Sequence, residues 1–307
     1  MGTVLLKNVS KTYDDGNILA VDNVSFDVKN GELFGLIGPD GAGKTSIFRI
    51  LTTLLLADNG QATVAGYDVV KDYSAIRNRI GYMPGKFSLY QDLSIKENLE
   101  FFATLFGTTI DENYELIKDI YDQIKPFNDR RAGKLSGGMK QKLALCCALI
   151  HKPEVLLLDE PTTGVDVVSR KEFWDMLKVL KKQGITILVS TPYMDEATLC
   201  DRIALIQKGE IMRVDTPNGI IASYPAQLYA VKSASIYQLL VDLKTNDRVT
   251  SCYAFGEYLH VTLASEEPME KLKQFIVDRG HDQVEVRSIM PSIEDCFIQL
   301  MNEKTRE

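Results

Sequence analysis

The stretch Gly38-Pro39-Asp40-Gly41-Ala42-Gly43-Lys44-Thr45 decides the fold of this 307-residue chain. It fits the pattern G-x-x-x-x-G-K-[ST], in which backbone and side-chain groups hold phosphate. A short apolar run, ELFGLIG (32–38), precedes it, and a helical stretch, SIFRILTTLLL (46–56), follows it. Strand, glycine turn and helix in this order predict the start of an α/β sheet with a phosphate site at the turn.

The glycines of this loop leave room for a phosphate ligand. Without side chains there, backbone N–H groups turn inward and approach phosphate oxygens. The following helix adds its positive N-terminal end, and Lys44 adds a cation for the β- and γ-phosphates of a nucleotide. Thr45 supplies a hydroxyl for Mg²⁺. We predict that residues Gly38 to Ser46 bind MgATP; the alternative is a glycine turn of chance composition.

Two carboxylates end a second apolar run, Val155-Leu156-Leu157-Leu158-Asp159-Glu160. A continuous apolar pattern is typical of a parallel strand buried on both faces, and ligands of open α/β sheets bind where such strands end. We expect Asp159 to hold Mg²⁺ through water, and Glu160 to orient or deprotonate the attacking water. The pattern LLLDE is common, and its pairing with the glycine loop makes the prediction specific.

Between these motifs lies Leu135-Ser136-Gly137-Gly138-Met139-Lys140-Gln141. Ser136 can cap the next helix while its two glycines leave N–H groups bare, which favours a second anion site; the alternative is a plain helix cap. Here the chain resembles the ATP-binding subunits of ABC transporters, whose signature is LSGGQ. The resemblance implies that Leu135 to Met139 face the γ-phosphate held by another subunit. Met139 replaces the usual glutamine, as in many drug-export members.

The resemblance covers residues 1 to about 224, with each landmark in the family's order. It implies that Tyr13 stacks on adenine, the alternative being an ordinary core or surface tyrosine. It also implies that the loop containing Asp166 crosses a dimer interface, and that residues from about 85 to 152 form a helical subdomain touching membrane subunits. Near the chain's end, Pro291-Ser292-Ile293-Glu294-Asp295-Cys296-Phe297 is similar to a segment of drug-export and antibiotic-resistance ATPases.

Two positions depart from the family in ways that concern hydrolysis. The family has a glutamine just after the strand ending in IGYMP, where this chain has Gly85, and the nearest glutamine, Gln91, lies six residues further on. The family has a histidine after ITILVST, where this chain has Pro192. Lys86 or Tyr193 could occupy the space. These departures predict slow basal turnover with ordinary ATP affinity.

The remaining pattern predicts two domains. Residues 1–225 are expected to form a P-loop NTPase cassette of the ABC type, with a mixed sheet, a helical subdomain and an N-terminal antiparallel β subdomain. Within it, RIALIQKGEIMRV (202–214) predicts two edge strands. Residues 226–307 follow the order strand, helix, two strands, helix, strand, helix. That order is typical of a small α+β accessory domain of the ferredoxin type.

The composition is that of a globular protein, with 45% hydrophobic and 25% charged residues and a net charge of −7. The acidic balance argues against electrostatic binding of nucleic acid. No apolar run reaches the length that crosses a bilayer, and the first residues lack the pattern of a secretory signal. Five cysteines without a C-x-x-C pair predict reduced, buried thiols. We expect peripheral attachment to the cytoplasmic face of the membrane through partner subunits.

Together the motifs predict an ATPase subunit of an ABC exporter. It would dimerise head to tail with a second cassette, of the same or a different chain, and drive transmembrane permease subunits. Each ATP would lie between residues 38–46 of one subunit and 136–138 of the other. The alternatives are a non-membrane ABC protein acting on ribosomes or DNA, and a regulatory module that scarcely hydrolyses ATP. The acidic charge disfavours the first, and Glu160 with the signature disfavours the second.

Overall fold

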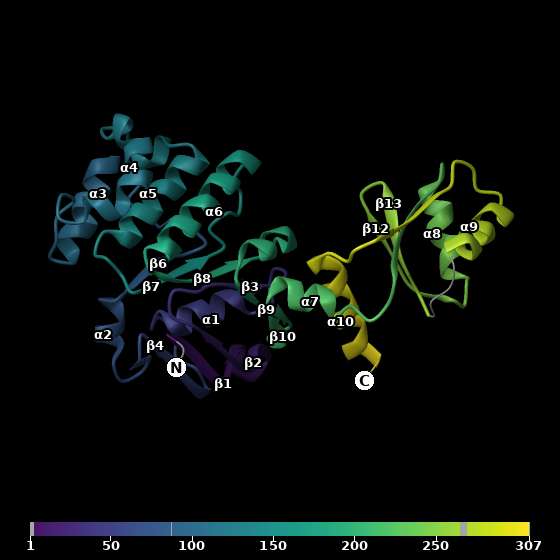
Figure 1. The fold of residues 1–307 in the computed structure, drawn as a ribbon. Coiled ribbons are helices and arrows are strands. Elements are labelled where there is room, and N and C mark those ends of the chain that lie inside the picture. The colour runs from purple at the N-terminus through teal and green to yellow at the C-terminus, as the bar shows by residue number, and fades with distance from the viewer. Residues whose placement is uncertain (1–2, 87, 265–268, 307) are drawn as a thin grey trace. The chain divides into compact units, whose positions relative to one another are not determined.

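The structure, a computed structural model, describes residues 3–86, 88–264 and 269–306 (Figure 1). The chain separates into two compact units, one ending at Pro217 and the other beginning at Asn218. The sequence pattern placed the boundary later, after Pro225, because the short helix α7 (Pro217–Ala222) was not distinguished from the first unit. Each unit has its own cluster of buried apolar residues and is described by itself.

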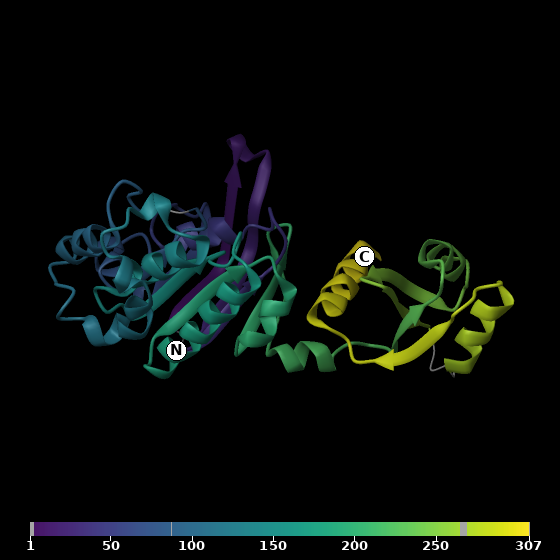
Figure 2. The same ribbon diagram turned by 90° about the horizontal axis from the view of Figure 1, so that it is seen from above.

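A four-stranded antiparallel sheet, in the order β2-β1-β4-β5, contains the N-terminal strands of the first unit. Strands β1 and β2 form the long purple ribbon in Figure 2, joined by a short turn, η1 (Asp14–Gly16). Val4, Leu6 and Val9 of β1 are buried, so one face of this sheet is apolar. The strands are β1 (Val4–Tyr13), β2 (Ile18–Val28), β4 (Asn59–Val64) and β5 (Tyr67–Asp68).

A six-stranded mixed sheet, in the order β10-β9-β3-β8-β7-β6, forms the centre of the first unit. Every residue of β3, β7 and β8 is buried, as predicted for parallel strands covered on both faces. The expectation that β9 lies at an edge is wrong: it pairs with both β3 and β10, because its four central residues are buried and apolar. The strands are β3 (Leu33–Ile37), β6 (Ile80–Met83), β7 (Val155–Asp159), β8 (Thr186–Thr191), β9 (Arg202–Gln207) and β10 (Glu210–Asp215).

Helices cover both faces of this central sheet. Helix α1 (Lys44–Leu51) lies between the two sheets, where its buried residues Ile47, Phe48 and Leu51 pack with strands of both. Helices α5 and α6 pack on the opposite face, and α3 and α4 lie beside α5 (Figure 1). The other helices of the unit are α2 (Tyr73–Arg77), α3 (Ile95–Leu105), α4 (Tyr114–Ile124), α5 (Gly137–Leu149) and α6 (Val167–Lys182), with 3₁₀ turns η2 (Lys125–Phe127), η3 (Ala132–Lys134) and η4 (Met194–Leu199).

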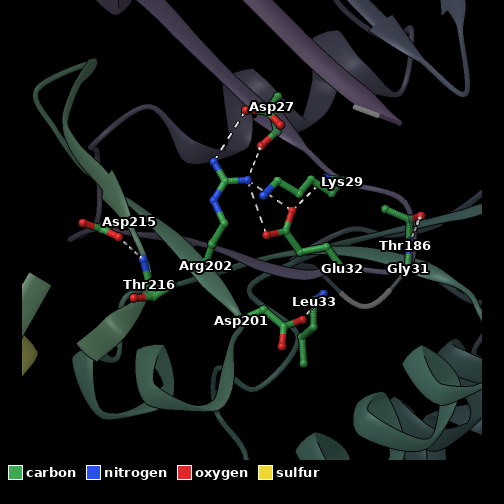
Figure 3. Close-up of polar contacts among 10 residues, drawn as sticks. All are labelled: Asp27, Lys29, Gly31, Glu32, Leu33, Thr186, Asp201, Arg202, Asp215 and Thr216. Atoms are coloured by element: carbon green, nitrogen blue, oxygen red, sulfur yellow. Dashed lines mark hydrogen bonds and ion pairs between the residues drawn. The ribbon is translucent and has the colours of Figure 1, made fainter. Parts of the chain in front are cut away.

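A cluster of charged groups holds the beginning of β3 (Figure 3). Nη1 of Arg202 lies 3.4 Å from Oε2 of the buried Glu32, and its Nη2 lies 3.5 Å from Oδ1 of Asp27. The backbone N–H of Leu33 donates to Oδ2 of Asp201 at 2.9 Å. These contacts join β2 and β9 to the start of β3. The glycine loop lies at the other end of β3, away from this cluster.

The second unit is built on a four-stranded antiparallel sheet in the order β12-β13-β11-β14. Its buried cluster joins one sheet face to α8 and α9. The predicted order of strands and helices is confirmed, whereas membership of the ferredoxin type stays a prediction. The elements are β11 (Leu228–Lys232), α8 (Ile236–Lys244), β12 (Val249–Phe255), β13 (Tyr258–Leu263), α9 (Met269–Asp278), β14 (Glu285–Ile289) and α10 (Ile293–Arg306).

Two composition-based expectations concern helices and cysteines. Within the described ranges, none of the helices has the length and apolar character needed to span a membrane. All five cysteines are buried and free, as predicted. Burial raises the pKa of the thiols of Cys146, Cys147 and Cys200, so these thiols stay protonated at neutral pH.

Candidate functional site

The glycine loop connects the end of β3 to the start of α1 and needs its glycines for steric reasons. Gly43 has a φ of +102°, and a Cβ there would lie 2.2 Å from the carbonyl oxygen of Ala20. A Cβ on Gly38 would lie 2.2 Å from the carbonyl oxygen of Ile206. Gly43 is also the N-cap of α1 and has no side chain to cap the first N–H groups of that helix, which suits an anion site.

Lys44 joins the loop to the carboxylate pair. Its side chain is almost fully buried, and its Nζ donates to the carbonyl oxygens of Gly38 at 2.7 Å and Pro39 at 3.0 Å. The same Nζ lies 3.0 Å from Oε1 of Glu160. The cation predicted to bind phosphate and the carboxylate predicted to act on water therefore meet in one place.

Asp159 ends β7 beside Lys44 and Glu160. Ser190 Oγ donates to Oδ1 of Asp159 at 2.7 Å, and the hydroxyl of Thr45 also hydrogen-bonds this carboxylate. Burial raises the pKa of Asp159 above its ordinary value, and the hydrogen bonds from Ser190 and Thr45 partly offset that rise. A carboxylate and a hydroxyl in contact are hard oxygen donors of the kind that Mg²⁺ prefers, so these residues fit the predicted metal.

Glu160 has a left-handed backbone, with a φ of +51°. This conformation is uncommon outside glycine and persists where surrounding contacts fix it. The backbone N–H of Glu160 donates to Ser190 Oγ at 2.9 Å and to the Ser190 carbonyl oxygen at 3.2 Å. Sequence reasoning missed Ser190, although a hydroxyl residue near the end of ITILVST was a usable signal, because this strand end neighbours Asp159 in the sheet.

Tyr13 ends β1 close to the beginning of α1. Its hydroxyl lies 3.1 Å from Ser46 Oγ, which places the predicted adenine-binding residue beside the phosphate loop. The end of β1 is held by Asp58, whose carboxylate accepts from Lys11 Nζ and from the backbone N–H of Thr12, each at 2.6 Å. These hydrogen bonds, that from Lys11 first, lower the pKa of Asp58 to about 2.

Asp40, a residue of the glycine loop, is exposed.

The signature residues begin α5. Ser136 caps this helix, since its Oγ accepts from the backbone N–H of Met139 at 3.3 Å. Gly138 packs against the first turn of α6, where a Cβ would lie 2.6 Å from Ser169 Oγ. Asp166 caps α6 by accepting from the backbone N–H of Ser169 at 3.0 Å, and this bond lowers the pKa of Asp166. The structure thus brings the signature and the predicted interface loop together.

Gly85 lies beside the carboxylate pair. A Cβ on Gly85 would approach the carbonyl oxygen of Asp159 to 3.1 Å, and Gly85, Gly137 and Glu160 all line one cavity of about 840 Å³. Gln141, whose amide nitrogen donates to the carbonyl oxygen of Pro161, lines the same cavity. The departure at Gly85 therefore falls next to the residues assigned to hydrolysis.

Pro192 directly follows β8, and its neighbour Tyr193 is already engaged. The guanidinium carbon of Arg170 lies 4.0 Å from the centre of the Tyr193 ring, and the backbone N–H of Tyr193 donates to Thr191 Oγ1 at 3.1 Å. Tyr193 is therefore held toward α6 by a cation–π contact. Arg170 is a second residue that sequence reasoning missed.

The family model described as "ABC transporter" matches residues 21–163. The probable multidrug ABC transporter ATP-binding protein YbhF of Escherichia coli K12 is 35% identical over 302 residues, which cover 97% of this chain and 52% of YbhF. The chain thus spans about half the length of that relative.

Two further matches extend over nearly the whole of the other protein. Nod factor export ATP-binding protein I of Burkholderia orbicola is 40% identical over 98% of this chain and 97% of its own. The solved dimer of the ATP-binding cassette MJ0796, in a post-hydrolysis state bound to ADP and Pi, is 28% identical with a TM-score of 0.63, covering 69% of this chain and 98% of its own. With the motifs and fold described above, these matches show that the chain belongs to the ATP-binding proteins of ABC transporters.

Proposed function

We propose that this chain binds MgATP at the glycine loop and hydrolyses it to drive a membrane exporter. The observation that carries the proposal is the contact of 3.0 Å between Lys44 Nζ and Glu160 Oε1, with the buried Asp159 beside them. Phosphoryl transfer to water depends mainly on positioning and on stabilising negative charge. The site brings together a cation, two carboxylates and the N–H groups at the start of α1. These groups can position the water and stabilise the negative charge.

The side chains would act in sequence. The N–H groups at the start of α1 and Lys44 Nζ bind the β- and γ-phosphates, and the phosphate charge then competes with Glu160 for Lys44. Mg²⁺, when bound through Asp159 and Thr45, would neutralise phosphate charge. Glu160, released from Lys44, accepts a hydrogen bond from the attacking water and orients it toward the γ-phosphate. Ser190 holds Asp159 and Glu160 at their relative positions.

A second cassette would complete the site. In this proposal Ser136, Gly137 and Gly138 present N–H groups to the γ-phosphate on a partner, and Asp166 lies at the dimer interface. Tyr13 stacks on adenine. The dimeric MJ0796 structure supports a two-cassette assembly. Permease subunits would supply the membrane attachment and hold the transported molecule, and the export names of the relatives favour an efflux system.

A second candidate, a slow switch, is favoured by Gly85 and Pro192. Gly85 offers no side chain beside Asp159, and Pro192 offers no hydrogen-bond donor after β8. Losing one positioned donor near a transition-state charge costs about 10²–10³ in rate. In this candidate, the chain is a regulatory module that binds ATP and scarcely hydrolyses it.

Phosphate release by the purified chain tests the proposal. We expect saturable, Mg²⁺-dependent release that stops when the metal is chelated and that Lys44→Ala reduces to background, together with a severe loss of ATP affinity by calorimetry. Lys181→Ala is the matched control. Lys181 pairs with Asp201 at 2.6 Å, near the start of β3, whereas the glycine loop follows the end of that strand. Phosphate release or ATP affinity in Lys44→Ala within twofold of the parent would contradict the assignment of the loop.

A further inference from the structure

The buried carboxylate of Glu196, in η4, joins three segments that surround the candidate site. Its Oε2 accepts from Thr162 Oγ1 at 3.0 Å and from Thr191 Oγ1 at 2.5 Å. Its Oε1 accepts from Nε of Arg170 at 3.1 Å and lies 3.0 Å from Nη2 of the same guanidinium. Glu196 is only 2% exposed, so protein groups, not solvent, satisfy its charge.

Each of the three segments contains a residue assigned to hydrolysis or to the partner interface. Thr162 lies two positions after Glu160, on the same loop. Thr191 precedes Pro192 and follows Ser190, which hydrogen-bonds the carboxylate of Asp159 and the backbone N–H of Glu160. Arg170 lies in the first turns of α6, where its backbone N–H donates to the carbonyl oxygen of Asp166 at 2.9 Å. One side chain therefore links the water-activating loop, the end of β8 and the interface loop.

The contacts of Thr191 fix the turn that follows β8. Thr191 Oγ1 donates to Glu196 and accepts from the backbone N–H of Tyr193, so the turn through Pro192 is closed on both sides. Arg170 adds the cation–π contact with Tyr193. A movement of the turn after β8 would have to break these contacts or carry Thr162 and α6 with it. Buried polar networks with every member satisfied are rigid in this way.

We propose that Glu196 is a positioning residue for hydrolysis, which holds the backbone after Glu160 in register with the end of β8 and with the interface loop. The inference rests on the proposed function, because it assumes that Glu160 acts on water. Glu160 has a strained left-handed backbone and needs such support. A displacement of about 1 Å in a catalytic group can cost on the order of 10²-fold in rate.

The competing explanation is that Glu196 only stabilises the fold, as buried ion pairs elsewhere do. The chain contains a matched control in Glu32, which is 7% exposed and pairs with Arg202 at 3.4 Å (Figure 3). Glu32 also accepts from the backbone N–H of Lys29 at 2.7 Å. It lies at the start of β3, whereas the site lies at the other end of that strand. In each variant a half-buried arginine loses its buried carboxylate partner and keeps a carboxylate contact of 3.5 Å, Arg170 with Asp195 and Arg202 with Asp27.

The experiment compares Glu196→Gln with Glu32→Gln in the full chain. For Glu196→Gln we expect kcat for ATP hydrolysis to fall at least about tenfold, while KM and the calorimetric Kd for MgATP stay within twofold, because the glycine loop is untouched. For Glu32→Gln we expect kcat and Kd within twofold of the parent. Both variants should melt at a lower temperature. The double variant Thr162→Val/Glu196→Gln should show a smaller decrease in log kcat than the sum of the decreases in the two single variants. The reason is that the two residues contact each other, so either substitution already removes that contact.

Two kinetic outcomes would overturn the inference: kcat of Glu196→Gln within twofold of the parent, or equal losses of kcat in the two variants. Amide hydrogen exchange of residues 161–170 provides a readout that needs no turnover. Exchange there should rise in Glu196→Gln and stay unchanged in Glu32→Gln, and equal exchange in both would also overturn it. The proposed function is tested separately by Glu160→Gln. Full ATPase activity of that variant would contradict the proposed function, whatever the result for Glu196→Gln.

Discussion

Nζ of Lys44 lies 3.0 Å from Oε1 of Glu160, so the cation proposed to bind phosphate and the carboxylate proposed to activate water form an ion pair. The phosphates of ATP must compete with Glu160 for this cation. Glu160→Gln removes the charge of the competitor and keeps its shape. We therefore expect the Kd of this variant for MgATP to be equal to that of the parent or up to about fivefold lower, since a partly exposed pair contributes about 1 kcal/mol.

Isothermal titration calorimetry provides this comparison. Glu154→Gln serves as the control, because Glu154 pairs with Arg79 at 3.2 Å before the start of β7, at the end away from the site. Its affinity should equal that of the parent. A Kd for Glu160→Gln more than twofold above the parent's would show that Glu160 supports nucleotide binding instead of competing with it.

The departures at Gly85 and Pro192 lead to a prediction about rate. Gly85→Gln with Pro192→His restores two polar side chains at the site, and the rate of phosphate release should rise at least about tenfold, given what one positioned donor contributes. The new Cβ at residue 85 needs the carbonyl of Asp159 to yield by a few tenths of an ångström, since it would start at 3.1 Å.

Gly85→Ala with Pro192→Ala is the matched control for that double variant. It introduces the same Cβ and removes the same proline ring without adding a polar group, so its rate should stay near that of the parent. If the Gln/His variant is slower than the parent, other residues have taken over these roles.

The position of α7 leads to a prediction about truncation. Ile220 of α7 is fully buried, and Cys296 Sγ lies 3.6 Å from its carbonyl oxygen within the second unit. A chain ending at Pro217 should be soluble and bind MgATP within twofold of the parent. A chain ending at Pro225 should bind equally but aggregate more readily, because it retains α7 without α10. Light scattering and calorimetry measure both properties, and unfolding of the shorter chain would refute the division at Pro217.

The raised pKa of Asp159 leads to a prediction about pH and stability. Because burial lifts the folded-state pKa above the unfolded value, the charged carboxylate costs stability at neutral pH, and this cost disappears as the pH falls through the raised pKa toward the ordinary one. Asp159→Asn should therefore melt at a higher temperature than the parent at pH 7, and the difference should shrink on acidification. The same variant should lose the dependence of ATP affinity on Mg²⁺. A melting temperature of Asp159→Asn below that of the parent at pH 7 would contradict the claim that the charged carboxylate of Asp159 destabilises the fold.

Residues that act within one continuous motif could be predicted from the sequence. The glycine loop, the strand ending in Asp159 and the cap formed by Ser136 each depend on neighbours in the chain, so spacing and residue type were sufficient. The order of elements in the second unit followed in the same way from its alternating pattern.

Features that depend on distant contacts could not be predicted in this way. Ser190 contacts Asp159 because β8 lies beside β7, and Glu196 reaches Thr162 across the same pairing. The hydroxyl near the end of ITILVST was a signal for Ser190, but no local pattern shows which distant residues Ser190 and Glu196 contact. The interior place of β9 likewise depends on its pairing with β3, and an apolar strand at a sheet edge has a similar composition.

Steady-state phosphate release by Glu160→Gln, measured beside the parent at saturating MgATP, tests the central claim most directly. The amide keeps the size and hydrogen-bonding reach of the carboxylate but cannot accept the proton of water. The account predicts a rate at least tenfold lower than that of the parent, with ATP-bound dimers accumulating on gel filtration. A Glu160→Gln variant that releases phosphate at the parent's rate would contradict the account, because water would then be activated elsewhere.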